Sequence, residues 1–220
     1  MNIYVVIEGE SACKKIYKNW IPLVNSNLVN IDNIREFTSN NFLIIAGHGQ
    51  PNIMGVIENS IEDVNSNQII DRLVIGMDSE EAEYNTKLAE LQNKVNNIGC
   101  RVEVKYIIQH FCIETWLLGN KAIIRRNPTD LELLKYINLY NVRTNDPELL
   151  PNLLDDCRTR SQFAYKYIRA GIRDKLNGRY MYSKRNPGIA CSEGYFSHIK
   201  NRYEITGHIM SFSDFIAAFS

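Results

Sequence analysis

Several carboxylates stand where apolar runs of the chain come to an end. Glu8 and Glu10 follow the first β-branched run, and Asp78 and Glu80 follow a later one. Asp78 and Glu80 are two residues apart, so in an extended or turn conformation both can reach one ion. Clustered carboxylates repel one another, and a hard divalent cation compensates that repulsion. We therefore expect an acidic metal site, provided that the two runs are neighbours in space.

A fifth carboxylate, Glu114, lies in the apolar stretch Cys-Ile-Glu-Thr-Trp-Leu-Leu at residues 112–118. A lone glutamate is costly to bury unless it is paired or bound to a metal. For any one of these acids the alternative is a helix cap or a solvated loop residue. Their joint occurrence at corresponding places is what favours a site.

Hydrophobic periodicity predicts the elements that must position these side chains. Short apolar runs predict strands, and apolar residues at three- and four-residue spacing predict helices between them. This alternation is typical of βαβ units and a mostly parallel, Rossmann-like sheet flanked by helices, in which functional groups collect beyond the carboxyl ends of the strands. The site requires the runs at 3–7 and 73–77 to be adjacent parallel strands. The predicted strands are 2–8, 42–46, 72–77 and one from 101, and the predicted helices are 11–20, 58–70 and 80–97.

The pattern changes after residue 120. Polar, proline-containing segments there separate helix-like stretches at roughly 160–176, 192–203 and 213–219. We expect an α/β domain at 1–125 and a helical C-terminal extension at 126–220 that packs on it.

The formal net charge is zero, but the charges are segregated along the sequence. Acids dominate residues 58–90 and bases dominate residues 158–185. Lys166, Arg169 and Arg173 recur at helical spacing among tyrosines, and such a surface can contact phosphates and stack on bases. The alternative is an ordinary solvated helix face. We expect this stretch to contact nucleic acid.

Composition and missing motifs exclude several other classes. The chain is 45% hydrophobic and 23% charged, and it contains no apolar run of 18 residues, so neither a membrane span nor a signal peptide is expected. Five scattered cysteines without a CxxC motif indicate reduced thiols in a cytoplasmic protein. The segment from Gly47 through His48 lacks the Gly-Lys-Ser/Thr of a P-loop, and His110 with Cys112 has no second pair with zinc-ligand spacing.

Three short motifs resemble a known family. Glu8-Gly9-Glu10 and Asp78-x-Glu80 are similar to the Glu-Gly and Asp-x-Asp motifs with which TOPRIM domains of topoisomerases, primases and OLD-family nucleases hold Mg²⁺. The segment 113–118 resembles the E-x-W-L-L signature of small stand-alone TOPRIM-like proteins found near bacterial anti-phage genes, as does the C-terminal region from 182 to 215. The second motif departs from the family pattern, because it is Asp-Ser-Glu and its last side chain is one methylene longer.

The resemblance implies a nuclease dependent on Mg²⁺ or Mn²⁺ that hydrolyses phosphodiester bonds, as an effector of anti-phage defence. Its implied partners are nucleic acid and an ATPase on another chain, and a homo-oligomer is left open. The alternative is a TOPRIM-like binding or sensor module without catalysis. The expected metal ligands are Glu8, Asp78 and Glu80, with Glu10 and Glu114 completing a second ion site or orienting water. Lys184 is expected to contact the scissile phosphate, and Lys166, Arg169, Arg173 and Lys184 to contact nucleic acid.

Overall fold

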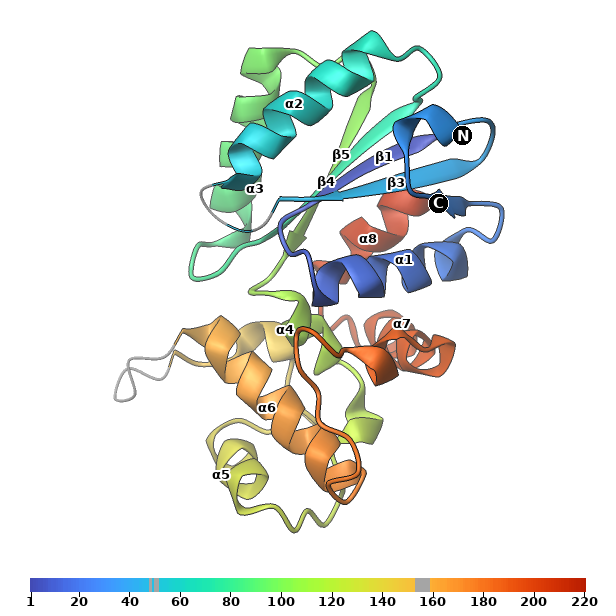
Figure 1. Ribbon diagram of the computed structural model, residues 1–220. Coiled ribbons are helices and arrows are strands. Elements are labelled where there is room, and N and C mark those ends of the chain that lie inside the picture. Colours follow the sequence, from blue (N-terminus) through green and yellow to red (C-terminus); the bar gives the residue numbers. More distant parts are fainter. Residues whose placement is uncertain (48, 50–51, 153–158) are drawn as a thin grey trace. The chain divides into compact units, whose positions relative to one another are not determined.

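The computed structural model describes residues 1–47, 49, 52–152 and 159–220 (Figure 1), and these form two compact units. The sequence predicted one boundary near residue 125, whereas the chain passes from the first unit to the second after Met77 and again after Ile108. The C-terminal segment from Asp214 returns to the first unit, so the helical region is not one continuous extension. The first unit contains Met1–Met77, Glu83–Ile108 and Asp214–Ser220, and the second contains Asp78–Ala82 and Gln109–Ser213.

The first unit is built on a parallel five-stranded sheet with the strand order β2-β3-β1-β4-β5. This confirms the predicted α/β class with a parallel sheet flanked by helices. The short strand β2 was not predicted, because it has three residues and its first, Val29, is 59% exposed. The strands are β1 (Ile3–Ile7), β2 (Val29–Ile31), β3 (Asn41–Ala46), β4 (Arg72–Asp78) and β5 (Glu103–Gln109).

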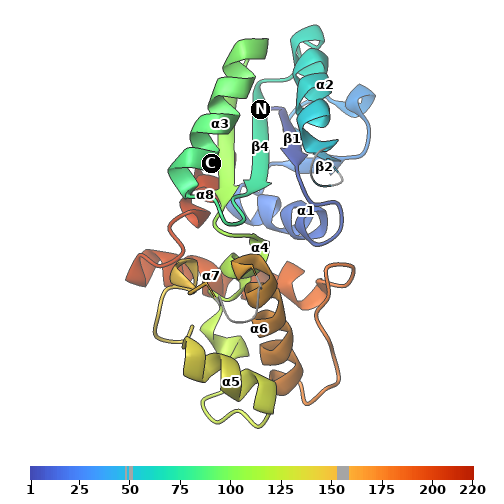
Figure 2. The same ribbon diagram turned by 90° about the vertical axis from the view of Figure 1, so that its left-hand side faces the viewer.

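Helices cover both faces of this sheet (Figure 1 and Figure 2). Successive side chains of a strand point to opposite faces, so Tyr4 and Val6 of β1 enter the core beneath α2 and α3. On the other face, the rings of Tyr17 in α1 and Phe215 in α8 meet edge to face, with centroids 4.9 Å apart. The helices are α1 (Ala12–Val24), α2 (Asn52–Ser66), α3 (Tyr84–Ile98) and α8 (Phe212–Phe219).

The second unit is mainly helical. The short helix α4 packs against α6, and α5 packs against the same helix. Thr159 caps the amino end of α6 by accepting a hydrogen bond from Gln162, as sequence preferences for helix starts require. Within the described ranges no helix has both the length and the apolar character to cross a membrane. The α-helices are α4 (Ile113–Leu117), α5 (Leu131–Leu139), α6 (Arg160–Lys175) and α7 (Glu193–Thr206), and the 3₁₀ turns include η2 (Lys121–Ile123) and η3 (Pro147–Leu149).

Candidate functional site

The strands that carry Glu8 and Asp78 are neighbours in the sheet. β1 pairs in parallel with β4, and Ile7 lies opposite Gly76. The next residue, Glu8, donates its backbone N–H to the carbonyl of Gly76 at 3.0 Å. The predicted adjacency of residues 3–7 and 73–77 is therefore confirmed. Glu8 follows the carboxyl end of β1, and Asp78 is the last residue of β4.

The loop after β1 is held from the β3 side by backbone hydrogen bonds. Gly47 donates its N–H to the carbonyl of Ile7 at 2.8 Å, and Gly49 donates to the carbonyl of Glu8 at 3.1 Å. A Cβ on Gly47 would lie 2.3 Å from Cδ1 of Ile53, so the close approach of α2 requires glycine there. Both glycines therefore hold the loop after β1 through backbone hydrogen bonds. His48 lies outside the described residues, Glu8 is half-buried, and Glu10 is exposed.

The loop after β4 is fixed to the chain that follows β5. Ser79 donates its N–H to Gln109 at 2.9 Å, and Glu80 donates to Phe111 at 2.9 Å. The buried hydroxyl of Ser79 lies 2.8 Å from Nδ1 of His110. Glu80 has a left-handed φ of 53° and an exposed side chain. The residue between Asp78 and Glu80 therefore anchors the loop, and His110 is engaged with that anchor.

The next acid of this loop, Glu81, binds the start of α6. It accepts a hydrogen bond from the backbone N–H of Arg160 at 2.6 Å, and Nε of Arg160 lies 3.2 Å from its other oxygen. A negative charge at the amino end of a helix is favourable. The guanidinium also lies 4.5 Å from the centroid of the Phe111 ring. The sequence analysis missed this contact, which joins acidic and basic segments far apart in the chain.

Glu114 is fully buried in α4, as its apolar surroundings predicted. Its Oε1 accepts a hydrogen bond from the hydroxyl of Tyr182 at 2.9 Å, whereas its buried Oε2 has no hydrogen-bond partner among the described residues. The nearby thiol of Cys112 has a pKa raised well above its usual value, first by burial and then by the negative charges of Glu114 and Asp78. Both carboxylates therefore act electrostatically on one buried thiol within the second unit.

The carboxylates have the right chemistry for a hard cation, but the described residues do not gather a complete ligand set. Carboxylate oxygens are the ligands that Mg²⁺ prefers, and Oε2 of Glu114 is a buried acceptor to which no described residue donates. Nevertheless, no group of three or more His, Cys, Asp or Glu side chains in the described part of the chain could hold a metal ion. The predicted metal ligands are thus positioned by strand ends and loops without forming a closed site.

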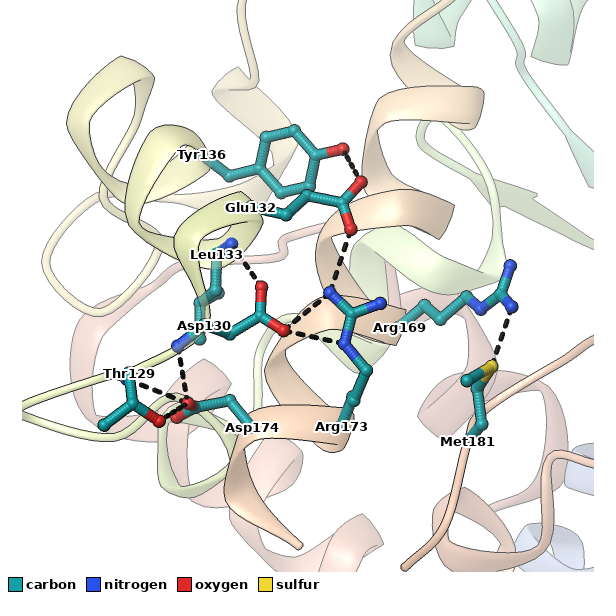
Figure 3. Close-up of polar contacts among 9 residues, drawn as sticks. All are labelled: Thr129, Asp130, Glu132, Leu133, Tyr136, Arg169, Arg173, Asp174 and Met181. Carbon is teal, nitrogen blue, oxygen red and sulfur yellow. Dashed lines mark hydrogen bonds and ion pairs between the residues drawn. The ribbon is translucent and has the colours of Figure 1, made fainter. Parts of the chain in front are cut away.

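The basic face predicted on α6 contains one arginine that is neutralised within the second unit. Arg173 Nη2 lies 2.6 Å from Asp130 and 2.9 Å from Glu132, and its Nε donates to Asp130 at 2.7 Å (Figure 3). Arg169 reaches Sδ of Met181 at 2.7 Å, and its buried Nε makes no hydrogen bond to any residue in the described ranges. Lys166 is half-buried and Lys184 is exposed. The charge of Arg173 is therefore largely compensated before any ligand binds.

The sequence analysis missed a second basic region in the same unit. Lys121, Arg125 and Arg126 lie close together in sequence, and with Arg143 and Lys175 they line one cavity. The three bases between Lys121 and Arg126 were the signal in the sequence that could have indicated this basic region. The convergence of Arg143 and Lys175 on it depends on tertiary structure alone.

Comparisons with known proteins identify no relative of this chain. No family model matches the sequence, and no curated protein or solved structure matches it either.

Proposed function

We propose that this protein is a divalent-metal-dependent nuclease, with its acidic centre at the carboxyl ends of β1 and β4. The observation that carries the proposal is the parallel pairing of Ile7 with Gly76, because it gives Glu8 and Asp78 neighbouring strand ends. Functional groups of parallel α/β sheets collect at this edge. Mg²⁺ or Mn²⁺ bound there would activate water and offset the charge that builds on the phosphate.

The proposed roles of the site residues follow from how exposed each side chain is. Glu8 and Asp78, both half-buried, would be the fixed ligands, and the exposed side chains of Glu10 and Glu80 would complete the set. Glu114 would orient water through its second oxygen, for which the described part of the chain supplies no hydrogen-bond donor. Lys184, which is exposed, would contact the scissile phosphate.

The proposed biological role is that of an effector in bacterial anti-phage defence. Its support is the resemblance of residues 113–118 to stand-alone TOPRIM-like proteins. Because the sequence has no Gly-Lys-Ser/Thr phosphate loop, the energy-dependent step would belong to an ATPase on another chain. The substrate would be DNA or RNA.

A second candidate is a binding or sensor module that has lost catalysis. Two observations favour it: the second motif reads Asp-Ser-Glu, and no three-ligand group is formed among the described residues. Such a module would keep the fold and its nucleic-acid contacts but would not cleave.

Cleavage of labelled DNA and RNA in Mg²⁺, Mn²⁺ or EDTA tests the first proposal. Glu8→Gln and Asp78→Asn keep the side-chain size but remove the charge that holds the ion, so each should lower cleavage by at least about 100-fold. Glu62→Gln is the matched control, since Glu62 is an exposed acid of α2 away from the strand ends. Circular dichroism should report an unchanged or slightly more stable fold for the two site variants, because carboxylate repulsion is relieved.

Calorimetric titration with Mn²⁺ separates the two candidates. Mn²⁺ binding that disappears in Asp78→Asn, together with cleavage by the wild type, supports the nuclease. Mn²⁺ binding without cleavage, even with the ATPase present, supports the inactive module. If no Mn²⁺ binds and no substrate is cleaved, the metal assignment is wrong.

A further inference from the structure

The second unit contains a basic cavity of about 440 Å³. Its walls come from η2 and the residues after it, from the turn at Arg143, from the carboxyl end of α6 and from α7. Among the described lining residues two are apolar, none is acidic, and none is Phe, Tyr or Trp. The charged and titratable lining residues are Lys121, Arg125, Arg126, Arg143, Lys175 and His198.

Backbone carbonyls hold two of the arginines in place while leaving their charge in the cavity wall. Arg143 donates to the carbonyl of Ile124, and Nη2 of Arg125 donates to the carbonyl of Lys175 at 3.0 Å. Arg125 has one weak ionic contact, with its Nε 3.7 Å from Oδ2 of Asp174. A carbonyl accepts a hydrogen bond without cancelling a full positive charge, so these contacts orient the guanidinium groups and do not neutralise them.

The remaining cations have no compensating carboxylate. Within the described ranges, no Asp or Glu oxygen lies within 4.0 Å of the charged nitrogens of Lys121, Arg126, Arg143 or Lys175. Oδ1 of Asp174, next to Lys175, accepts hydrogen bonds from Thr129 at 2.9 and 3.0 Å (Figure 3), and Oδ2 makes the 3.7 Å contact with Arg125. The cavity therefore concentrates positive charge.

The buried cation Arg202 acts electrostatically on the lining residue Lys121. Arg202 donates to the neutral carbonyls of Leu118 at 3.1 Å and Asn145 at 2.6 Å, and the carboxylate of Asp146 acts on it electrostatically. The pKa of Lys121 is lowered by burial first, and then by the positive charges of Arg202 and Arg143. The cations thus destabilise one another in the ligand-free protein, and an anion between them would relieve that repulsion.

From this geometry we infer that the cavity is a binding site for a compact polyphosphate, either a free di- or triphosphate or that group of a nucleotide. Cations that converge on one hollow suit adjacent phosphates, and arginine side chains bind phosphate oxygens with paired N–H groups. Because no Phe, Tyr or Trp is among the described residues that line the cavity, it offers no large ring for stacking a base, and recognition is directed to the phosphates. The inference does not depend on the proposed nuclease activity.

Calorimetry with sodium tripolyphosphate and the full chain, in buffer free of divalent metals, tests the inference. The test variant combines Arg126→Gln with Lys175→Gln, because both side chains are exposed and neither supports the cavity through a side-chain hydrogen bond to a described residue. Tripolyphosphate should bind the wild type, bind more weakly as salt is added, and lose about tenfold in affinity per cation removed.

The matched control combines Lys135→Gln with Arg179→Gln, which removes the same charge from exposed positions outside the cavity lining. It should bind like the wild type, and both double variants should keep the wild-type melting temperature. Glu8→Gln should also leave tripolyphosphate binding unchanged, so failure of the acidic site is distinguishable from failure of this one.

Three results would overturn the inference. The first is absence of tripolyphosphate binding to the wild type, and the second is an equal loss in the control variant, which would indicate binding through net charge alone. The third is tighter, Arg126- and Lys175-dependent binding of a single-stranded oligonucleotide without a terminal phosphate. That result would make the cavity a contact for a nucleic-acid backbone. ATP and inorganic phosphate, as additional probes, should bind through the same residues, with phosphate the weaker because it carries fewer charges.

Discussion

The backbone N–H of Glu8 donates a hydrogen bond to the carbonyl oxygen of Gly76, and the two atoms are 3.0 Å apart. Ile7 is the last residue of β1 that is paired with β4, and this bond extends the hydrogen-bonded ladder by one residue. The candidate acidic centre therefore begins where the sheet is still hydrogen-bonded. Directly beneath the same point, Tyr17 of α1 approaches Gly76 so closely that an added Cβ would lie 3.1 Å from its hydroxyl.

Gly76→Ala should therefore destabilise the first unit. Its new Cβ would lie 3.1 Å from Oη of Tyr17 and 3.3 Å from Cγ2 of Ile7, and overpacking of this kind costs about 1–3 kcal/mol. In a Tyr17→Phe background the cost should be smaller, because the nearest atom is gone. Urea denaturation of the two single variants and the double variant measures this coupling.

Gly55→Ala is the matched control for that experiment. Gly55 is exposed in the interior of α2, and a Cβ there would meet no atom within 4 Å. Alanine should raise the free energy of unfolding by about 0.5–1 kcal/mol, because glycine loses more backbone entropy in a helix. Equal destabilisation by both substitutions would mean that close packing at Gly76 is not the cause.

Tyr182→Phe should be costly because it removes the one side-chain hydrogen bond that a described residue makes to the buried carboxylate of Glu114. Stranding a buried acceptor costs about 1–3 kcal/mol, and more when it is charged. Replacing both partners, as Glu114→Met with Tyr182→Phe, should cost less than the sum of the single changes. Tyr203→Phe, whose hydroxyl has no hydrogen bond to a described residue, should stay within about 0.5 kcal/mol of the wild type. Additive losses in the double variant would contradict the pairing.

The raised pKa of Glu148 makes the free energy of unfolding of the second unit depend on pH. Burial raises its pKa from 4.5 to about 7, although hydrogen bonds from Ser211 oppose the shift. Between these values the folded chain holds a proton that the unfolded chain has lost. Its contribution to the free energy of unfolding is therefore complete below pH 4.5 and decreases as the pH rises to about 7, by at most on the order of 3 kcal/mol.

Glu148→Gln should remove that slope, since the amide keeps an acceptor for Ser211 and does not titrate. The measurement is chemical denaturation of both proteins from below the lower pKa to above the higher one. The wild type should lose stability relative to the variant across this window. Parallel pH profiles for the two proteins would show that Glu148 does not carry a raised pKa.

β1 and β4, which carry the candidate acidic centre, could be predicted because both are continuous apolar runs that end in charge. α2 was predicted too late, at 58–70, because Gly55 lies inside its first half, whereas the helix starts at Asn52. α1 runs on to Val24 although Pro22 lies inside it, since tertiary packing overrides the local preference. Local signals therefore located the strand ends better than the helix bounds.

Pairing of charges could not be predicted from the sequence in the same way. The basic stretch around Arg173 looks uncompensated along the chain, yet its partners Asp130 and Glu132 lie 43 and 41 residues upstream. The cavity is the opposite case: Arg143 and Lys175 reach Lys121 only through the packing of the second unit. A local charge count cannot distinguish these two outcomes, because the difference lies in which acids the fold brings near.

This difference predicts separate effects for two bases of α6. Arg173→Gln should lower the free energy of unfolding by about 0.5–1 kcal/mol, because its partly exposed ion pairs with Asp130 and Glu132 are lost. Lys166→Gln should leave stability unchanged but flatten the salt dependence of oligonucleotide binding by up to roughly one unit of log–log slope. Fluorescence anisotropy over a range of salt concentrations measures that slope.

Glu132→Gln is the control for Arg173, since it breaks one ion pair without removing a base. If Arg173→Gln flattens the slope as much as Lys166→Gln while Glu132→Gln does not, Arg173 contacts phosphate despite its acidic partners, and α6 is a nucleic-acid surface along its whole length.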